Sequence, residues 1–299
     1  MEEPTQQVQV NLFDIYTISK RTNPSIEEFE FIDLFAGIGG IRIAFENVGG
    51  KCVFSSEMDT YAQRTYQTNF GEQPHGDITK IHPREIPNFD VLCAGFPCQP
   101  FSQAGHKLGF EDTRGTLFFN IAEIIKEKQP KAFFLENVRG LLKHDEGRTF
   151  DVIARVIKDL GYSLHYKIIR ASDFNLPQHR PRLFMVGFRN KNAMFDFPQP
   201  QPLTFKMKDI FNAKDINREI GFTLRVGGRG SNINDRRNWE FYMVDGEIKR
   251  VSVKEAKKMQ GFPDDYIFPV SEVQAMKQLG NSVAINAVQA VAKNIVRSL

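Results

Sequence analysis

The stretch FEFIDLFAGIGG, residues 29–40, places three local signals next to one another. Apolar and aromatic side chains dominate residues 29–37, which predicts a buried strand. Gly37, Gly39 and Gly40 then supply a turn at which a ligand could approach the backbone closely, although their spacing is not that of the dinucleotide fingerprint. The following residues 40–49, GIRIAFENVG, read as a helix. A strand, a glycine turn and a helix in succession favour an α/β fold.

The alternation of strands and helices continues beyond this stretch. Further strands are predicted at 51–57, 89–96, 131–138 and 182–188. Helices are predicted at 58–70, 116–129 and 149–162. Strands that alternate with helices through short connections indicate an α/β fold with a mostly parallel sheet, covered by helices on both faces.

Length and composition set broad bounds on the protein. A chain of 299 residues, of which 41% are hydrophobic, can form one large domain or two smaller ones. Its three cysteines fit neither a disulfide framework nor a zinc pattern, so we expect a reducing cytoplasm and no metal. The polar start MEEPTQQVQV predicts no signal peptide, and no apolar run is long enough to predict a membrane helix.

Residues 205–255 differ from the rest and are called the basic insert below. From residue 205 to residue 250 there are ten lysines and arginines against seven aspartates and glutamates, a net excess equal to that of the whole chain. Residues 225–238, RVGGRGSNINDRRN, lack helical periodicity, and VDGE at 244–247 predicts a hairpin turn. We expect a small domain of β-strands and loops between a larger domain's two parts, 1–204 and 256–299. A solvated surface region is the simpler alternative.

Several polar residues follow the predicted strands, where ligands bind in open α/β sheets. Glu57 ends the second strand, a place where a carboxylate can bind ribose hydroxyls, and Asp77 could accept a hydrogen bond from an adenine amino group. Together with the glycine turn, these residues favour a cofactor that contains a nucleoside. Each feature alone is also compatible with a purely structural role.

A candidate reactive group lies in GFPCQPFS, residues 95–102. Cys98 follows a strand, and the prolines on both sides restrict its backbone, whereas Cys93 inside the strand reads as packing. Glu136 ends another strand, and a buried carboxyl there must be paired or act as an acid. Arg180 and Arg182, at alternating positions, can point one way and supply positive charge that favours a thiolate.

The motifs that carry this chemistry form an ordered series. They are DLFAGIGG, SSEMD, GDIT, GFPCQPFS, DTRGTLFF, LENVRG, QHRPRLF, MQGFPDDY and GNSVA. In this order the chain resembles the DNA cytosine-5 methyltransferases of the small bacterial restriction–modification type, over nearly all of its length outside the basic insert. The resemblance implies a Rossmann-like methyltransferase domain that uses S-adenosyl-L-methionine, and a target-recognition domain at the basic insert.

The resemblance also implies a mechanism on double-stranded DNA. The target cytosine would be flipped out of the duplex, and Cys98 would attack C6 of its ring. Glu136 would hydrogen-bond and protonate N3, so that C5 becomes nucleophilic and takes the methyl group. Loss of the C5 proton would then expel Cys98. Arg182 would contact O2 of the base, with Arg180 in support.

The remaining site residues are carried over by position. The cofactor would be bound by Phe35, Gly37, Gly39, Glu57, Met58, Asp77, Ile78, Pro97, Asn281 and Val283. DNA would be contacted by Ser102, Arg114, Thr223, Arg225, Arg229, Arg236 and Arg237. Met58 stands where the family often has a large aromatic residue, so a less specific contact with adenine is expected. The basic insert resembles those of enzymes that act on GCGC-centred sites. We expect a monomer and a cognate restriction endonuclease that acts separately.

Three other classes of protein could share parts of this pattern. A tRNA cytosine-5 methyltransferase would use the same scaffold, but the chain has PCQ and lacks the RNA-type CFT signature. A DNA-binding protein without catalysis would be expected to have lost Cys98 or Glu136. An amino methyltransferase would carry a [DNS]PP[YF] motif, which the chain lacks.

Overall fold

The computed structural model describes residues 28–97, 117–226 and 231–299. These residues form a six-stranded sheet in the order β2-β1-β3-β4-β6-β5 and a separate two-stranded sheet, β7-β8. The large sheet consists of β1 (Phe29–Leu34), β2 (Gly50–Ser56), β3 (Val91–Gly95), β4 (Ala132–Val138), β5 (His165–Arg170) and β6 (Pro181–Phe188). Pairing among β1 to β4 is parallel, and β6 runs antiparallel to both β4 and β5. The expectation of a mostly parallel α/β sheet is confirmed.

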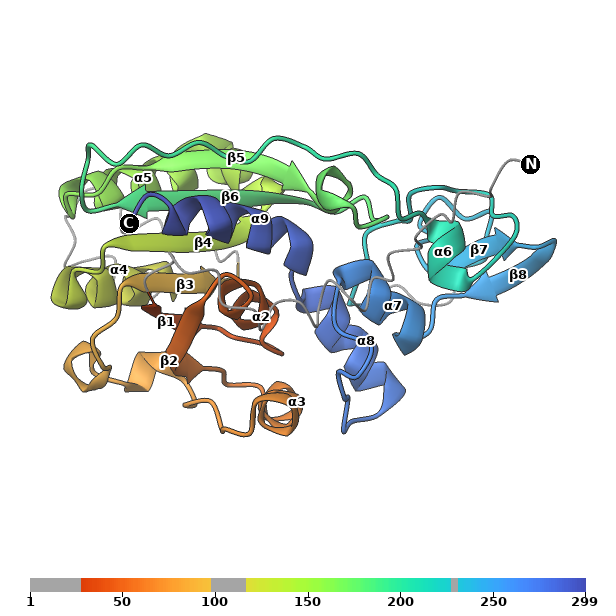
Figure 1. Cartoon of the computed structure of the whole chain (residues 1–299), viewed down its shortest axis with the longest axis horizontal. Coiled ribbons are helices and arrows are strands. Elements are labelled where there is room, and N and C mark those ends of the chain that lie inside the picture. Colours follow the sequence, from red (N-terminus) through yellow and green to blue (C-terminus); the bar gives the residue numbers. More distant parts are fainter. Residues whose placement is uncertain (1–27, 98–116, 227–230) are drawn as a thin grey trace, which may run out of the picture.

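Helices cover both faces of the large sheet (Figure 1). Helices α2 (Gly40–Glu46) and α9 (Ile285–Val296) pack on one face, and α4 (Leu117–Lys128) and α5 (Arg148–Asp159) pack on the other. Strand β1 serves both faces, because Phe31 joins the hydrophobic cluster of α2 and α9 while Ile32 joins that of α4 and α5. This two-sided burial explains the continuous apolar runs of the strands.

The other elements lie around this frame. They are α3 (Thr60–Phe70), the 3₁₀ segments Ile78–Lys80, Pro83–Glu85, Arg139–Gly147 and Ala171–Phe174, α6 (Met207–Phe211), β7 (Phe241–Val244), β8 (Glu247–Arg250), α7 (Val253–Gln260) and α8 (Glu272–Asn281). No helix in the described ranges is long and apolar enough to cross a membrane. Strand β5 was not predicted from the sequence; it is an edge strand, and most of its residues are exposed or half-buried, so it lacks the apolar run of its neighbours.

The two-stranded sheet lies with α6 and α7 beyond one end of the large sheet (Figure 1). Asp245 and Gly246, both with positive φ, make the two-residue turn between β7 and β8, which confirms the predicted hairpin. Trp239, just before β7, and Tyr242, within it, are buried and belong to the same hydrophobic cluster as α2 and α9. The small sheet is therefore packed onto the rest of the chain and not tethered by loops alone.

Candidate active site

The described chain brings β3 and β4 together at the carboxyl edge of the sheet. Gly95, the last residue of β3, pairs with Glu136 of β4. The Asn137 side chain donates a hydrogen bond of 2.9 Å to the carbonyl oxygen of Phe96. Pro97, which follows, is exposed. The next predicted residues, Cys98, Ser102 and Arg114, lie outside the described residues, as does Arg229.

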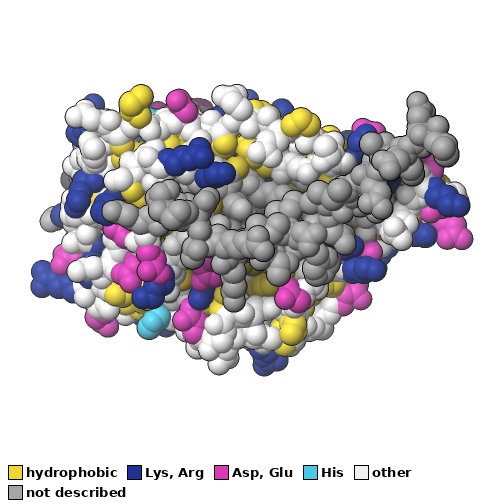
Figure 2. All heavy atoms as spheres, in the orientation of Figure 1, with side chains coloured by type: hydrophobic (Ala, Val, Ile, Leu, Met, Phe, Trp, Pro, Cys, Tyr) yellow, Lys and Arg dark blue, Asp and Glu magenta, His cyan; other side chains and the backbone are white. Residues whose placement is uncertain are grey.

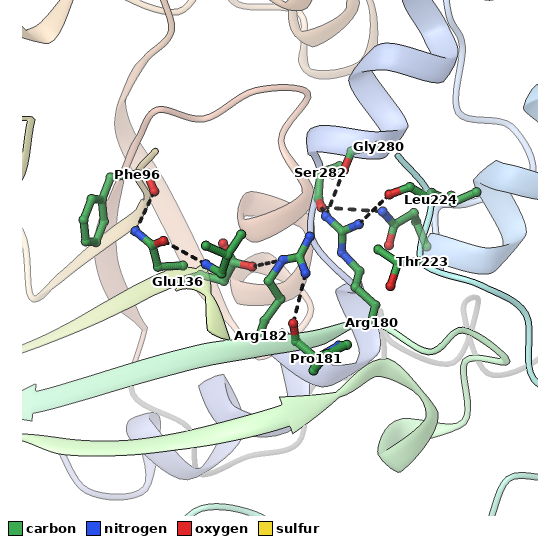
Figure 3. A network of polar contacts seen from close by, with 12 residues as sticks. Phe96, Glu136, Arg180, Pro181, Arg182, Thr223, Leu224, Gly280 and Ser282 are labelled. Carbon is green, nitrogen blue, oxygen red and sulfur yellow. Dashed lines mark hydrogen bonds and ion pairs between the residues drawn. The ribbon is translucent and has the colours of Figure 1, made fainter. Parts of the chain in front are cut away.

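Glu136 and Arg182 form a buried ion pair at this edge (Figure 3). The Arg182 Nε lies 3.0 Å from the Glu136 Oε1, and little of either side chain is exposed. Burial raises the pKa of the Glu136 carboxyl, and the charges of Arg182 and Arg180 oppose that rise. Because its pKa is raised, this carboxyl holds its proton to higher pH than a solvated glutamate and can share it with a ring nitrogen. The geometry thus offers a proton donor with a cation beside it.

Arg180 has a different environment from Arg182, although the two extend the same way from the chain (Figure 3). Its guanidinium donates hydrogen bonds to the backbone carbonyls of Leu224, Gly280 and Ser282. Burial lowers the pKa of Arg180 to about 9, and the like charge of Arg182 adds to that effect. The described contacts of Arg180 are therefore with backbone, and it contributes charge to Glu136 only from a distance.

The predicted glycine turn lies between β1 and α2 and has an unusual backbone. Phe35, Gly37 and Gly39 all have positive φ, the left-handed region that a side chain disfavours. A β-carbon at Gly39 would lie 2.2 Å from the Phe70 ring, so only glycine fits there. A β-carbon at Gly37 would meet no described atom within 4 Å. The backbone at Gly37 is accordingly open to a ligand.

Glu57 follows β2 and is joined to the turn by hydrogen bonds. Its carboxylate accepts from the backbone N–H of Gly37 at 2.8 Å and of Asp59 at 2.7 Å. A carboxylate has about four acceptor positions, so Glu57 can still accept from a ribose hydroxyl. Burial raises the pKa of Glu57, which these two donors oppose. Its position fits the predicted ribose contact.

The groups predicted to hold adenine are also available for contact. The Asp77 Oδ1 accepts from the backbone N–H of Thr79 at 3.0 Å and from its hydroxyl at 2.8 Å, and these bonds lower the pKa of Asp77. The Asp77 Oδ2 can therefore accept from an amino group as a carboxylate. Met58 is 67% exposed and presents an unbranched apolar side chain, while Ile78 is buried.

The C-terminal segment returns to the glycine turn. A β-carbon at Gly40 would lie 2.9 Å from both the Ser282 Oγ and a methyl of Val283, so the two segments are in close contact. Val283 is buried and Asn281 is exposed at the end of α8. Tyr266 ties the segments further, because its hydroxyl donates to the carbonyl of Ile38. Residues far apart in sequence are thus in close contact at the glycine turn.

The described residues of the basic insert show two kinds of arginine. Arg225 and Arg236 are exposed. Arg237 instead places its Nε and Nη2 on the two oxygens of Asp235, at 3.1 and 2.8 Å, and this pairing lowers the pKa of Asp235 to about 2. Figure 2 shows basic and acidic side chains interspersed at this end of the molecule. Thr223 is half-buried and donates its hydroxyl hydrogen to the carbonyl oxygen of His179.

Sequence reasoning did not assign several buried polar residues near the site. Asp33 lies in β1, fully buried, and neither of its oxygens has a hydrogen-bond partner among the described residues. Burial raises the pKa of Asp33 to about 8. Gln178 and Gln260 are buried with hydrogen bonds to backbone. All three lie inside motifs quoted above, DLFAGIGG, QHRPRLF and MQGFPDDY, and this was the signal in the sequence that could have identified them.

The chain is similar to known proteins over its whole length. Residues 29–227 and 217–297 match the family described as C-5 cytosine-specific DNA methylase. The type II methyltransferase M.HpaII of Haemophilus parainfluenzae is 44% identical, covering 100% of this chain and 96% of that protein. M.HhaI of Haemophilus parahaemolyticus is 42% identical, over 90% of this chain and 94% of that protein. The Dnmt2 methyltransferase of S. pombe superposes with a TM-score of 0.70 at 17% identity, covering 91% and 99% of the two chains, and shares the fold.

The family match and the curated relatives define a methyltransferase that uses S-adenosyl-L-methionine. The chain belongs to the C-5 cytosine-specific DNA methylase family, and it is a DNA (cytosine-5-)-methyltransferase. The resemblance found in its motifs is confirmed.

Proposed function

We propose that this enzyme is the modification methyltransferase of a type II restriction–modification system, and that it methylates C5 of a flipped cytosine in one short sequence of double-stranded DNA. The single observation that carries the chemistry is the buried Glu136–Arg182 pair, 3.0 Å apart, at the carboxyl edge of the sheet. The strand next to it ends at Gly95, three residues before Cys98. The type II methyltransferases that resemble the chain along its length support the biological setting.

The proposed mechanism assigns each catalytic step to a residue of this chain. The Cys98 thiolate forms a bond to C6 of the cytosine as Glu136 delivers a proton to N3, which leaves electron density at C5. S-adenosyl-L-methionine supplies an electrophilic methyl group when bound. After C5 is methylated, a water molecule takes the C5 proton, the C5–C6 double bond re-forms, Cys98 leaves as a thiolate and N3 returns its proton to Glu136. Arg182 holds the base through O2 and keeps positive charge beside Glu136.

The cofactor assignment rests on the fit of the residues around the glycine turn. Glu57 can still accept a hydrogen bond from ribose, and Asp77 keeps one oxygen for the adenine amino group. Phe35, Gly37 and Gly39 shape the open turn. Met58, Ile78, Pro97, Asn281 and Val283 complete the proposed set.

We also propose the division of the chain into a catalytic domain, 1–204 with 256–299, and a target-recognition domain, 205–255. The separate hairpin of β7 and β8 supports this division. The enzyme would act as a monomer in the cytoplasm, with a cognate endonuclease acting separately. Thr223, Arg225 and Arg236 are proposed to contact DNA, together with Ser102, Arg114 and Arg229 outside the described residues.

A labelling experiment tests the function directly. The purified protein is incubated with tritiated S-adenosyl-L-methionine and plasmid DNA, and 5-methylcytosine is mapped by bisulfite sequencing. Methylated cytosines in one short motif are expected. A parallel incubation with tRNA serves as the control, and label in tRNA without label in DNA would contradict the proposal.

A further inference from the structure

Three buried polar side chains form a cluster between the large sheet and the basic insert. Gln178, Arg180 and Gln260, called the linking cluster below, are at most 2% exposed. Gln178 and Arg180 stand just before β6, and Gln260 ends α7. Most buried polar groups are hydrogen-bonded, so the partners of this cluster indicate what it holds in place.

The glutamines of the linking cluster hold backbone from three separate segments. The Gln178 Oε1 accepts from the Leu224 N–H at 3.1 Å, and its Nε2 donates to the Met259 carbonyl at 3.0 Å. The Gln260 Nε2 donates to the Leu279 carbonyl at 2.6 Å. The Gln178 and Gln260 side chains also contact each other, with Nε2 and Oε1 3.3 Å apart. One cluster therefore joins the start of β6, the basic insert and α8.

Arg180, the charged member of the linking cluster, binds backbone carbonyls of the same segments. Its guanidinium donates to the carbonyls of Leu224 at 3.4 Å and Gly280 at 3.0 Å, and also to Ser282 (Figure 3). No acidic side chain forms an ion pair with it in the described ranges. A buried cation held by carbonyl oxygens alone costs solvation energy that a hydrophobic residue would not. Such a group is better explained by the position it imposes on those carbonyls than by its contribution to stability.

The segments held in this way bear on both recognition and chemistry. Arg182, which pairs with Glu136, lies in β6, two residues beyond Arg180. On the other side, the backbone of Arg225 lies so close to Gly280 that a β-carbon there would be 2.8 Å from the Arg225 carbonyl carbon. The path from Arg182 to the exposed Arg225 thus runs through buried hydrogen bonds and close backbone contact. A β-carbon at Gly40 of the glycine turn would also lie 2.9 Å from the Ser282 Oγ, so this segment packs closely against the turn.

We propose that Arg180 is a positioning residue for DNA selectivity: it sets where residues 223–225 lie relative to the Glu136–Arg182 pair. This inference rests on the proposed role of the basic insert in reading DNA. When Arg180 is present, contact of residues 223–225 with the correct sequence places the flipped cytosine against Glu136. When Arg180 is lost, residues 223–225 are no longer held at a fixed position relative to Glu136 and Arg182. Discrimination between DNA sequences should therefore fall more than the rate of the chemical step.

The test uses Arg180→Met and Arg180→Lys in the full chain, with Arg155→Met, an exposed residue of α5, as the matched control. Steady-state kinetics on plasmid DNA give kcat and KM, and bisulfite sequencing gives the methylated contexts. For Arg180→Met we expect KM for DNA to rise about tenfold, with a smaller change in kcat. The ratio of methylation at sites that differ from the wild-type motif by one base to methylation at the motif itself should rise by a similar factor.

Arg180→Lys keeps the charge and should recover part of the selectivity, whereas the Arg155→Met control should match the wild type. A lower kcat with unchanged KM and an unchanged motif would overturn the inference, because it would place Arg180 in catalysis. If Arg180→Met does not fold, which loss of S-adenosyl-L-methionine binding would show, Gln178→Met decides. That change removes the hydrogen bonds to the Leu224 N–H and the Met259 carbonyl without touching a proposed DNA contact, and it should relax the motif in the same direction. An unchanged motif there would contradict the inference, whereas a wild type that methylates no motif would instead contradict the proposed function.

Discussion

The carboxyl edge of the large sheet and the basic insert use charge in opposite ways. At the sheet edge, Glu136 and Arg182 are paired and largely buried, and burial raises the pKa of the carboxyl. In the basic insert, Arg237 pairs with Asp235 at the surface, and Arg225 and Arg236 are exposed. Buried charges are held in one geometry and act strongly on one another, whereas exposed charges are screened by water and salt. The first arrangement suits bond making, and the second suits binding to a polyanion.

The comparison predicts that changes at the sheet edge act on the chemical step and that changes in the basic insert act on DNA binding. The largest effect is expected for Cys98→Ser. The hydroxyl is a much weaker nucleophile than a thiolate, so methyl transfer should fall by roughly 10³-fold or more. Tritium transfer to plasmid DNA measures it, and binding of S-adenosyl-L-methionine serves as the folding control. Turnover near the wild-type rate would remove Cys98 as the nucleophile.

Glu136→Gln should have the next largest effect. The amide keeps the shape but cannot protonate N3, so we expect kcat to fall by about 10²- to 10⁴-fold. In the wild type, burial holds the pKa of Glu136 above its ordinary value, so kcat should fall as pH rises through that pKa and the proton is lost. The variant has no such group. The pH profile of the variant should therefore lack this fall in kcat at high pH. The same fall in both proteins would show that another residue donates the proton.

Asp33→Asn tests the effect of a buried charge on the stability of the fold. Burial raises the pKa of Asp33 from 3.8 to about 8, so the folded state binds a proton that the unfolded state has released between these pH values. The free energy of unfolding should therefore fall as pH rises through this window. Asparagine does not titrate, so the variant should not lose this stability, which in the wild type is on the order of a few kcal/mol at pH 8.5. Urea unfolding at pH 5 and pH 8.5 measures it.

The exposed Asp159→Asn serves as the control for Asp33→Asn and should keep the wild-type pH dependence. If Asp33→Asn keeps it as well, Asp33 does not carry the proton.

The smallest effects should come from the arginines of the basic insert, and they should differ from each other. Arg225→Ala should raise KM for DNA by about tenfold and lower the salt dependence of binding, since its charge is exposed. Arg237→Ala should change KM by less than about threefold, because Asp235 already engages its guanidinium. Binding titrations at two salt concentrations separate the cases. A larger change in KM for Arg237→Ala than for Arg225→Ala would contradict the prediction that Arg225 is the residue that binds DNA.

The two regions also differ in what the sequence could predict. The positions of Glu57 and Glu136 near strand ends could be predicted, because strand ends are visible as breaks in apolar runs and parallel strands bring their carboxyl ends to one edge. The partners of Arg180 could not be found, because Leu224 and Gly280 are 44 and 100 residues away and contribute only backbone oxygens. Strand β5 was missed because its residues are mostly exposed.

In the basic insert, composition predicted charge and the Asp245–Gly246 turn predicted a hairpin, which the structure contains. Composition did not separate Arg237 from Arg225, because that difference depends on whether a carboxylate such as Asp235 folds back onto the guanidinium. Local signals thus determine turns and strand ends, while the pairing of charges depends on tertiary contacts.

The central claim is that Cys98 forms a covalent bond to the target cytosine beside Glu136. A DNA duplex with 5-fluorocytosine at the methylated position tests it most directly, because fluorine cannot leave C5 as a proton does and the adduct is trapped. After incubation with S-adenosyl-L-methionine and proteolysis, mass spectrometry locates the modified residue. The account predicts a stoichiometric adduct on Cys98. An adduct on Cys52 or Cys93, or none while ordinary DNA is methylated, would contradict it.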